Sequence, residues 1–348
     1  RYLPEGAVQH LGHQIALQHR ARLVLAACHH QARHRHLFEP LDAILPGHEA
    51  APHRHQARHL VRWPLGEPRL EAAHQAARDV ADQEAAGALL EPDGVGVHPL
   101  KLAFGYLKRA RVAGAKVHTS SPVLGWETHN GIHYLRTPNG IVKAKRVAVA
   151  TGGYTPNGLH PHLSGKIMPI LSNSIVTRPL TEAERAEAGL HSTTFITDTR
   201  TLRHYYRLLP DGSMQCGSRS SLTGADADNP VHLERLKEGL YRKFPSLRGI
   251  PIAYSWWGWV DVSHDMMPRI VQPNPEESIY YAIGYGGNGV SFSAMAGLRL
   301  AERVMGIHRP QFELPIYQSP LPSHLFRPFR RLGQALLYRW YHLRDEVL

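Results

Sequence analysis

The chain has 348 residues, of which 43% are hydrophobic and 20% charged. It can therefore bury a core, and long disorder is not expected. No apolar run reaches the ~20 residues of a membrane helix, and two cysteines exclude a disulfide scaffold or a four-cysteine zinc site. The net charge of +11 is dispersed without a nucleic-acid motif. We expect a cytoplasmic protein that does not bind nucleic acid.

Residues 1–87 differ in composition from the rest of the chain. They hold twelve of the 25 histidines and no Ser, Thr, Asn, Lys or Met. The pairs His30/His34 and His55/His59 have a helical spacing that suits a metal. No carboxylate is placed as a third ligand, so no metal site is expected. We expect poor order here, and a second hypothesis is a non-native reading frame, which sequencing the upstream DNA would test.

Regular patterns begin at residue 88. The spacing predicts a helix over 102–113, ended by a glycine, and a strand over 116–128. A hairpin follows, with strands over 131–137 and 141–144 around the turn Pro138-Asn139-Gly140. The apolar run over 146–150 predicts a buried strand that ends in small residues. Residues 88–164 therefore read as part of a layered α/β domain.

The next hundred residues read as a second domain, over 165–265. Strands are predicted over 167–178, 194–197, 204–209, 213–217 and 252–260, with a helix over about 232–244. This pattern indicates an α+β domain dominated by an antiparallel sheet. A buried strand over 278–283 and a helix over 293–305 then return to the α/β type. In the tail, 311–348, apolar residues at helical spacing predict a basic amphipathic helix.

A glycine-rich turn joins that last buried strand to its helix. Gly284, Gly286, Gly287 and Gly289 remove side chains where the helix begins. Backbone N–H groups at a helix N-terminus carry partial positive charge. They suit a phosphate or the edge of a reduced flavin. The alternative is a tight structural turn without a ligand.

The order of these motifs resembles the superfamily of FAD-dependent D-amino-acid, glycine and sarcosine oxidases, and within it the amine-oxidising branch. The resemblance covers about residues 88–345. Its motifs are His98-Pro99-Leu100, Ser121-Pro122-Val123, Ala150 to Tyr154, Tyr205-Tyr206-Arg207, Pro210-Asp211-Gly212, Trp257-Gly258, Asp265 to Pro268, and Gly284 to Val290.

The resemblance implies an incomplete Rossmann-like α/β flavin-binding domain, made of 88–164 and 266–310, and an α+β substrate domain, 165–265. It also implies that the tail helix packs along the flavin domain rather than on a membrane surface. Family members open with a Gly-x-Gly-x-x-Gly unit that binds the FAD pyrophosphate. Residues 1–87 contain no such pattern. We therefore expect an FAD-dependent lineage in which this chain alone binds FAD poorly.

The implied reaction is oxidation of a C–N bond in a small amine or amino acid, with hydride transfer to FAD and hydrolysis of the imine. Tyr206 or Arg207 would contact the substrate, one of the two because they alternate along a strand. Trp257 would wall the cavity or belong to the core, and His264 would accept a proton or cap a turn. The resemblance assigns FAD contacts to Val123, Thr151, Gly152, Gly153, Gly284, Gly286, Gly287, Asn288, Gly289 and Val290. The alternative function is a non-catalytic binding protein with a His-rich metal-binding extension. Oligomeric state stays open.

Overall fold

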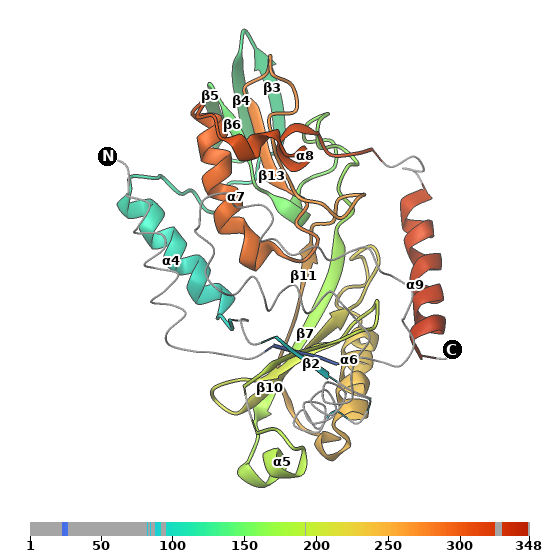
Figure 1. The fold of residues 1–348 in the computed structure, drawn as a ribbon. Coiled ribbons are helices and arrows are strands. Elements are labelled where there is room, and N and C mark those ends of the chain that lie inside the picture. The colour runs from blue at the N-terminus through green and yellow to red at the C-terminus, as the bar shows by residue number, and fades with distance from the viewer. Residues whose placement is uncertain are drawn as a thin grey trace.

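The computed structural model describes residues 23–26, 82, 84, 88–91, 95–191, 193–323 and 329–346. The ribbon divides into a lower part built on one large sheet and an upper part built on two small sheets, with long strands running between them (Figure 1). The four histidines considered above as metal ligands, His30, His34, His55 and His59, lie outside the described residues.

The large sheet has seven strands in the order β11-β7-β10-β9-β8-β1-β2. Its antiparallel strands are β7 (Ile170–Pro179), β8 (Phe195–Asp198), β9 (Tyr205–Leu208), β10 (Ser213–Arg219) and β11 (Ile252–Val260). Two short strands, β1 (Leu23–Ala26) and β2 (Ala88–Glu91), extend it beyond β8. The antiparallel sheet expected over 165–265 is present, and it also takes in strands that precede residue 165.

One face of this sheet is buried, and we call it the core face. It packs against α6 (Pro230–Lys243), whose Leu236 and Leu240 join Ile175, Tyr206 and Cys216 in one hydrophobic cluster. The helix begins where the Asn229 side chain accepts the N–H of Val231, with a proline at the first helical position.

The opposite face, which we call the open face, carries the alternate residues of each strand. In register across four strands, Tyr205 lies opposite Gly217, Gly217 opposite Ser174, and Ser174 opposite Trp256. Alternation places Arg207 on this face as well. The open face therefore holds the strand residues that the core does not use.

The upper part contains the α/β layer. Strand β6 (Val147–Val149) runs parallel to β13 (Ile279–Ile283), which pairs antiparallel with β12 (Arg269–Val271). All five residues of β13 are buried, as its continuous apolar run predicts. Helix α7 (Gly289–Val304) packs on this sheet with Ala296 and Leu300. Next to it lie Phe312 and α8 (Pro315–Gln318).

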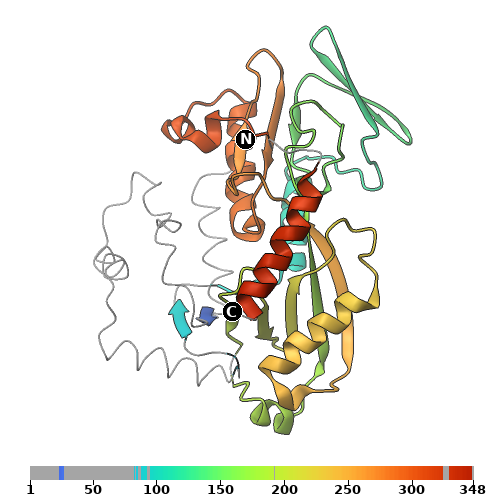
Figure 2. The ribbon, with the colours of Figure 1, turned by 90° about the vertical axis from the view of Figure 1, so that its right-hand side faces the viewer.

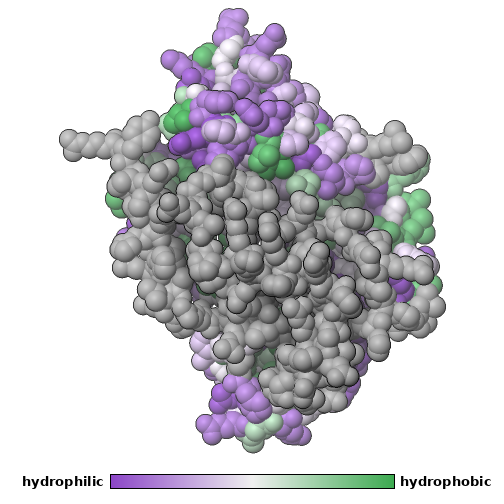
Figure 3. Space-filling view, viewed as in Figure 1, coloured by the Kyte–Doolittle hydropathy of each residue, from purple (hydrophilic) through white to green (hydrophobic). Residues whose placement is uncertain are grey.

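A three-stranded antiparallel sheet projects from the upper end (Figure 1). It comprises β3 (Gly125–His129), β4 (Ile132–Thr137) and β5 (Gly140–Ala144), and its surface is mainly hydrophilic in Figure 3. Helix α4 (Pro99–Val112) buries none of its residues, and the apolar Leu100 and Phe104 are more than half exposed.

Most predicted elements begin and end within a few residues of their predicted bounds. The prediction of a strand over 116–128 was wrong for its first part, because β3 starts only at Gly125. Before it, Ser120 has a positive φ of 53° and Pro122 lacks an N–H donor. Helix α7 starts at Gly289, four residues before its predicted start. Helix α5 (Glu182–Glu187) was not predicted.

The predicted tail helix is α9 (Arg330–Glu346). The Arg331 guanidinium donates to the carbonyls of Pro169 and Leu222, and Asp345 accepts the N–H of Thr201. The helix crosses in front of the large sheet in Figure 2. It therefore contacts residues around the large sheet, whereas we expected it along the flavin domain. Among the described helices, none combines the length and apolar character needed to cross a membrane.

Candidate active site

The glycine turn leads directly into α7. Gly284, Gly286 and Gly287 have φ values of 86°, 62° and 103°, which other residues rarely adopt. Among the described residues, a Cβ on Gly287 would meet only Val260, at 4.0 Å, so the outer side of Gly287 is open in the described part of the chain. The side chain of the helix-capping residue Asn288 forms no capping hydrogen bond. The start of α7 is therefore open at Gly287, while the Tyr285 ring lies against Gly289, 3.5 Å from a Cβ built there. An open helix N-terminus of this kind suits an anionic group.

Asp261 anchors this turn, and sequence reasoning missed it. Its carboxylate accepts the N–H of Gly284 at 2.6 Å, and its carbonyl accepts the N–H of Gly286 at 2.8 Å. Burial raises the pKa of the Asp261 carboxyl, against the lowering effect of the N–H donors. The sequence does contain a signal for this residue, because Asp261 is an acidic residue that directly follows the long strand β11. The residue fixes the turn to the end of that strand.

A second glycine pair lies against the same strand end. Gly152 has a φ of 52°, and a Cβ on Gly153 would lie 2.9 Å from the Cβ of Trp259. The pair belongs to η2 (Gly152–Tyr154), where the hydroxyls of Thr151 and Thr155 are 2.7 Å apart. The structure thus brings Thr151, Gly152 and Gly153 to the β11 end that also holds the glycine turn. Val123 is half-buried in the extended segment before β3.

Tyr205 is the open-face residue with the most specific surroundings. Its hydroxyl lies 2.8 Å from the hydroxyl of Ser172 and 3.3 Å from that of Ser174. Its ring crosses Gly217, where a Cβ would come within 2.3 Å of ring atoms. Ser172 pairs with Gly258 of β11, two residues before Val260. The Tyr205 hydroxyl is therefore held near the strand end that meets the glycine turn. A glycine inside strand β10 was the available signal for this close approach.

The two residues after Tyr205 point in opposite directions, as alternation predicts. Tyr206 is 2% exposed in the core cluster, and its hydroxyl donates to Asp82. Arg207 donates from Nε to Gln215 at 2.9 Å, and its guanidinium lies 4.3 Å from the centre of the Phe195 ring. Burial lowers the pKa of Arg207. Of the two substrate candidates, Arg207 is therefore the one on the open face.

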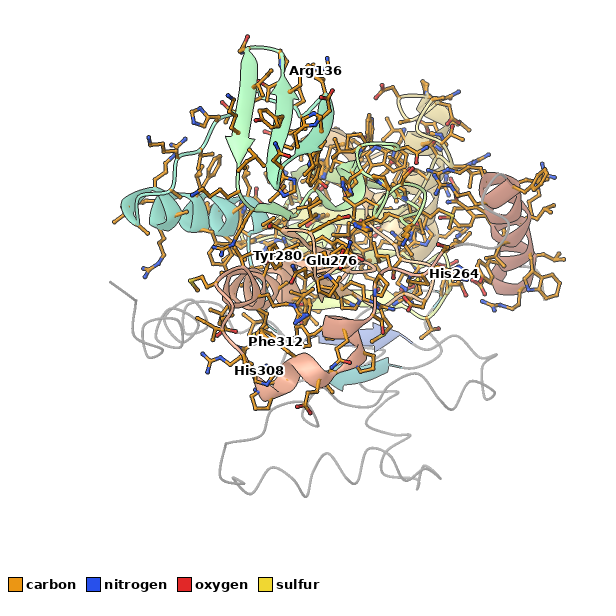
Figure 4. The ribbon with its side chains drawn as sticks, turned by 90° about the horizontal axis from the view of Figure 1, so that it is seen from above. Arg136, His264, Glu276, Tyr280, His308 and Phe312 are labelled. Carbon is orange, nitrogen blue, oxygen red and sulfur yellow. The ribbon has the colours of Figure 1, made fainter. Side chains whose placement is uncertain are left out.

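The structure separates the remaining candidates. Trp257 alternates with Trp256, and its indole Nε1 donates to Asp228 at 2.7 Å, which directs it away from the open face. His264 is exposed in the turn after β11, on the α9 side of the molecule in Figure 4. That turn flanks the glycine turn, because a Cβ on Gly286 would lie 3.3 Å from the carbonyl of Met266.

These residues fit the ring end of a flavin. The turn offers a helix N-terminus that is open at Gly287, beside a sheet face that carries the positioned hydroxyl of Tyr205. The pyrophosphate-binding unit of the resembling oxidases would fall within 1–87, which contain no Gly-x-Gly-x-x-Gly pattern. Nearly all of these residues lie outside the described structure. In the described part of the chain, no group of three or more His, Cys, Asp or Glu side chains could hold a metal ion.

Comparison with known proteins identifies the class. The profile of the family described as FAD dependent oxidoreductase matches residues 2–303. The chain therefore belongs to this family, whose cofactor is FAD. The match includes residues 2–87, although they contain no Gly-x-Gly-x-x-Gly pattern. The α/β flavin-binding fold predicted from the sequence is confirmed.

Among curated relatives, gamma-glutamylputrescine oxidoreductase of Escherichia coli is 32% identical over 274 residues, 78% of this chain and 62% of that protein. Glycine oxidase of Bacillus subtilis is 23% identical and covers 70% of this chain and 63% of its own length. The chain thus spans less than two thirds of the length of these relatives.

Solved structures share the fold. Glycine oxidase from Geobacillus kaustophilus aligns with a TM-score of 0.63 and 16% identity, over 92% of this chain and 81% of that one. L-proline dehydrogenase from P. horikoshii aligns with a TM-score of 0.60 and 15% identity, over 89% of this chain and 79% of that one.

Proposed function

We propose that this chain oxidises the C–N bond of a small amine or amino acid, with FAD at the glycine turn and the substrate on the open face. The observation that carries the proposal is the approach of Val260, at the end of β11, to Gly287. This approach joins a flavin-type helix start to the sheet face that holds Tyr205. The glycine turn would hold FAD, which would supply the acceptor for the hydride of the carbon next to the nitrogen.

The chain's own residues would bind and orient the substrate. The α7 N–H groups would stabilise negative charge on the flavin edge through preorganised dipoles. Tyr205 would orient the substrate through its hydroxyl, and Arg207 would bind a carboxylate at the far side of the open face. His264 remains a candidate proton acceptor beside the turn. Trp257 would affect the site indirectly, because its hydrogen bond to Asp228 helps to fix the position of strand β11.

The first experiment is reconstitution with FAD. The purified chain is incubated with FAD, freed of excess cofactor by gel filtration, and its visible flavin absorbance is recorded. Small amines and amino acids are then added without oxygen. The family match extends over residues 2–303, so we expect retained flavin, in place of the poor binding expected from the missing glycine pattern. We also expect bleaching by at least one amine. A colourless protein after reconstitution, or bound flavin that no amine bleaches, would contradict the proposal.

Two alanine variants test whether the turn holds the flavin. Gly287→Ala places a side chain in the open approach, and we expect at least a tenfold loss of FAD affinity. Gly306→Ala is the matched control, because Gly306 also has a positive φ, 75°, and no atom of the described residues lies within 4 Å of its Cβ position. Equal losses in both variants would assign the effect to backbone strain instead.

The proposal also includes the molecules that the protein binds and the cellular compartment in which it works. A small-molecule substrate accounts for the site without any nucleic acid. Cys216 is a free thiol in the described structure, which is typical of proteins in a reducing compartment. On that ground we propose that the protein works in the cytoplasm.

A further inference from the structure

Among the described strands, none covers the outer edge of β11, and its register shift lies at one end, at Ala253. β11 is the first strand in the order of the large sheet. Figure 2 shows it at the border of the sheet, on the side away from the grey trace. Its nine residues, IAYSWWGWV, include no charge and no proline. Natural proteins usually protect such an edge with charges, prolines, bulges or a covering element.

The exposed part of this edge is short, and it is limited at both ends. Residues 253–257 are all exposed, with Tyr254 at 69%, Trp256 at 47% and Trp257 at 37%. Beyond them, the N–H of Trp259 donates to the hydroxyl of Tyr154, so η2 covers that end. Ile252 is partly buried at the other end. The middle of the exposed stretch is Ser255.

The backbone groups of this stretch have a definite orientation. The N–H of Trp259 points away from β7, since it reaches Tyr154. Successive residues alternate in the direction of their backbone groups along a strand. Residues 255 and 257 therefore direct their N–H and C=O groups outward, and the shift in the register with β7 at Ala253 marks the end of this pattern. These groups provide the pattern that an antiparallel partner strand requires.

We propose that residues 253–257 pair with the same residues of a second copy of this chain, antiparallel and around a two-fold axis at Ser255. This register sets Ser255 against its own copy, Tyr254 against Trp256 of the second copy, and Ala253 against Trp257 of the second copy. The axis thus holds small side chains, and each flank holds an aromatic cross-strand pair. A stretch without charge meets no like-charge repulsion when it pairs with itself. The resulting interface is isologous and closes at two copies.

The first test is the mass of the purified chain by light scattering after gel filtration. We expect twice 39.0 kDa at micromolar concentration. Ser255→Lys sets two lysines against each other at the axis, and we expect the mass of one chain with an unchanged circular dichroism spectrum. Ile141→Lys is the matched control, because Ile141 is 60% exposed on β5, an edge strand of another sheet, and it should stay dimeric.

The second test traps the axis covalently. In a Cys28→Ala background, Ser255→Cys should form a disulfide-linked dimer on mild oxidation, whereas Asn139→Cys, in the exposed β4–β5 turn, should not. The remaining Cys216 is fully buried. A single-chain mass at every concentration, assemblies other than two copies, a dimer that survives Ser255→Lys, or equal cross-linking of both cysteine variants would overturn the proposal. None of these measurements depends on flavin binding or activity.

Discussion

At the residue scale, the contact between Tyr205 and Gly217 has a clear energetic consequence. A Cβ at Gly217 would lie 2.3 Å from ring atoms of Tyr205, so Gly217→Ala forces the ring to move. We expect a loss of about 1–3 kcal/mol in the free energy of unfolding, which is typical of overpacking. Gly297→Ala lies on the exposed side of α7, where no atom of the described residues comes within 4 Å of the new Cβ, and it should not lower the free energy of unfolding.

A double-mutant cycle in urea denaturation checks the cause. In a Tyr205→Ala background the clash is absent, and Gly217→Ala should then be nearly neutral. If Gly217→Ala costs the same in both backgrounds, the ring contact is not responsible. The same variant should weaken substrate binding, because the Tyr205 hydroxyl would leave Ser172 and Ser174.

The buried thiol of Cys216 offers a second test at this scale. Burial raises the pKa of Cys216 to about 12, so the thiol stays protonated at neutral pH. In a Cys28→Ala background, a disulfide reagent should modify the native protein far more slowly than the urea-unfolded protein. Similar rates in the two states would show that the core face opens readily.

At the element scale, the hydrogen bond from Gly284 to Asp261 fixes the glycine turn to β11. Asp261→Ala leaves this buried N–H without an acceptor, which costs about 1–3 kcal/mol. Asp261→Asn retains an oxygen acceptor and removes a charge that burial disfavours, because the pKa of Asp261 is raised. We therefore expect thermal stability and FAD affinity to fall in the alanine variant and to be preserved in the asparagine variant. Equal losses would assign the role to charge.

The elements also show how far the sequence predicts this structure. Strand β11 was predicted with its observed bounds, 252–260, because a run rich in aromatic and β-branched residues, between a proline and a polar turn, favours a strand. The glycine turn was also predicted, because glycines between a buried strand and an amphipathic helix form a pattern that is local in the sequence. Asp261 and Tyr205 were missed as site residues because their roles depend on contacts between distant segments. Whether Tyr206 or Arg207 faced the open side depended on which face α6 covers, and that is set by tertiary packing.

At the scale of the whole molecule, a buried charge network joins the segment before β2 to the core face. The ammonium of Lys243 is fully buried and lies 3.1 Å from Asp198, 3.0 Å from Glu84 and 3.4 Å from Asp82. Burial alone would raise the pKa of Asp198. Hydrogen bonding to His204 and the charges of Lys243 and Arg200 outweigh it, so the pKa of Asp198 lies well below its usual range.

This lowered pKa predicts acid sensitivity. A carboxyl whose folded pKa lies below its unfolded value, about 3.9 for Asp, stabilises the fold above that value and loses its contribution as the pH falls further. The free energy of unfolding should therefore decrease steeply below about pH 4. Asp198→Asn should flatten this dependence and cost about 3 kcal/mol at neutral pH, because the buried ammonium of Lys243 loses one partner. Urea denaturation between pH 3 and 7 measures both effects, with Glu187→Gln, an exposed carboxylate on α5, as the control. An Asp198→Asn protein with the wild-type acid dependence would show that the network does not control stability at low pH.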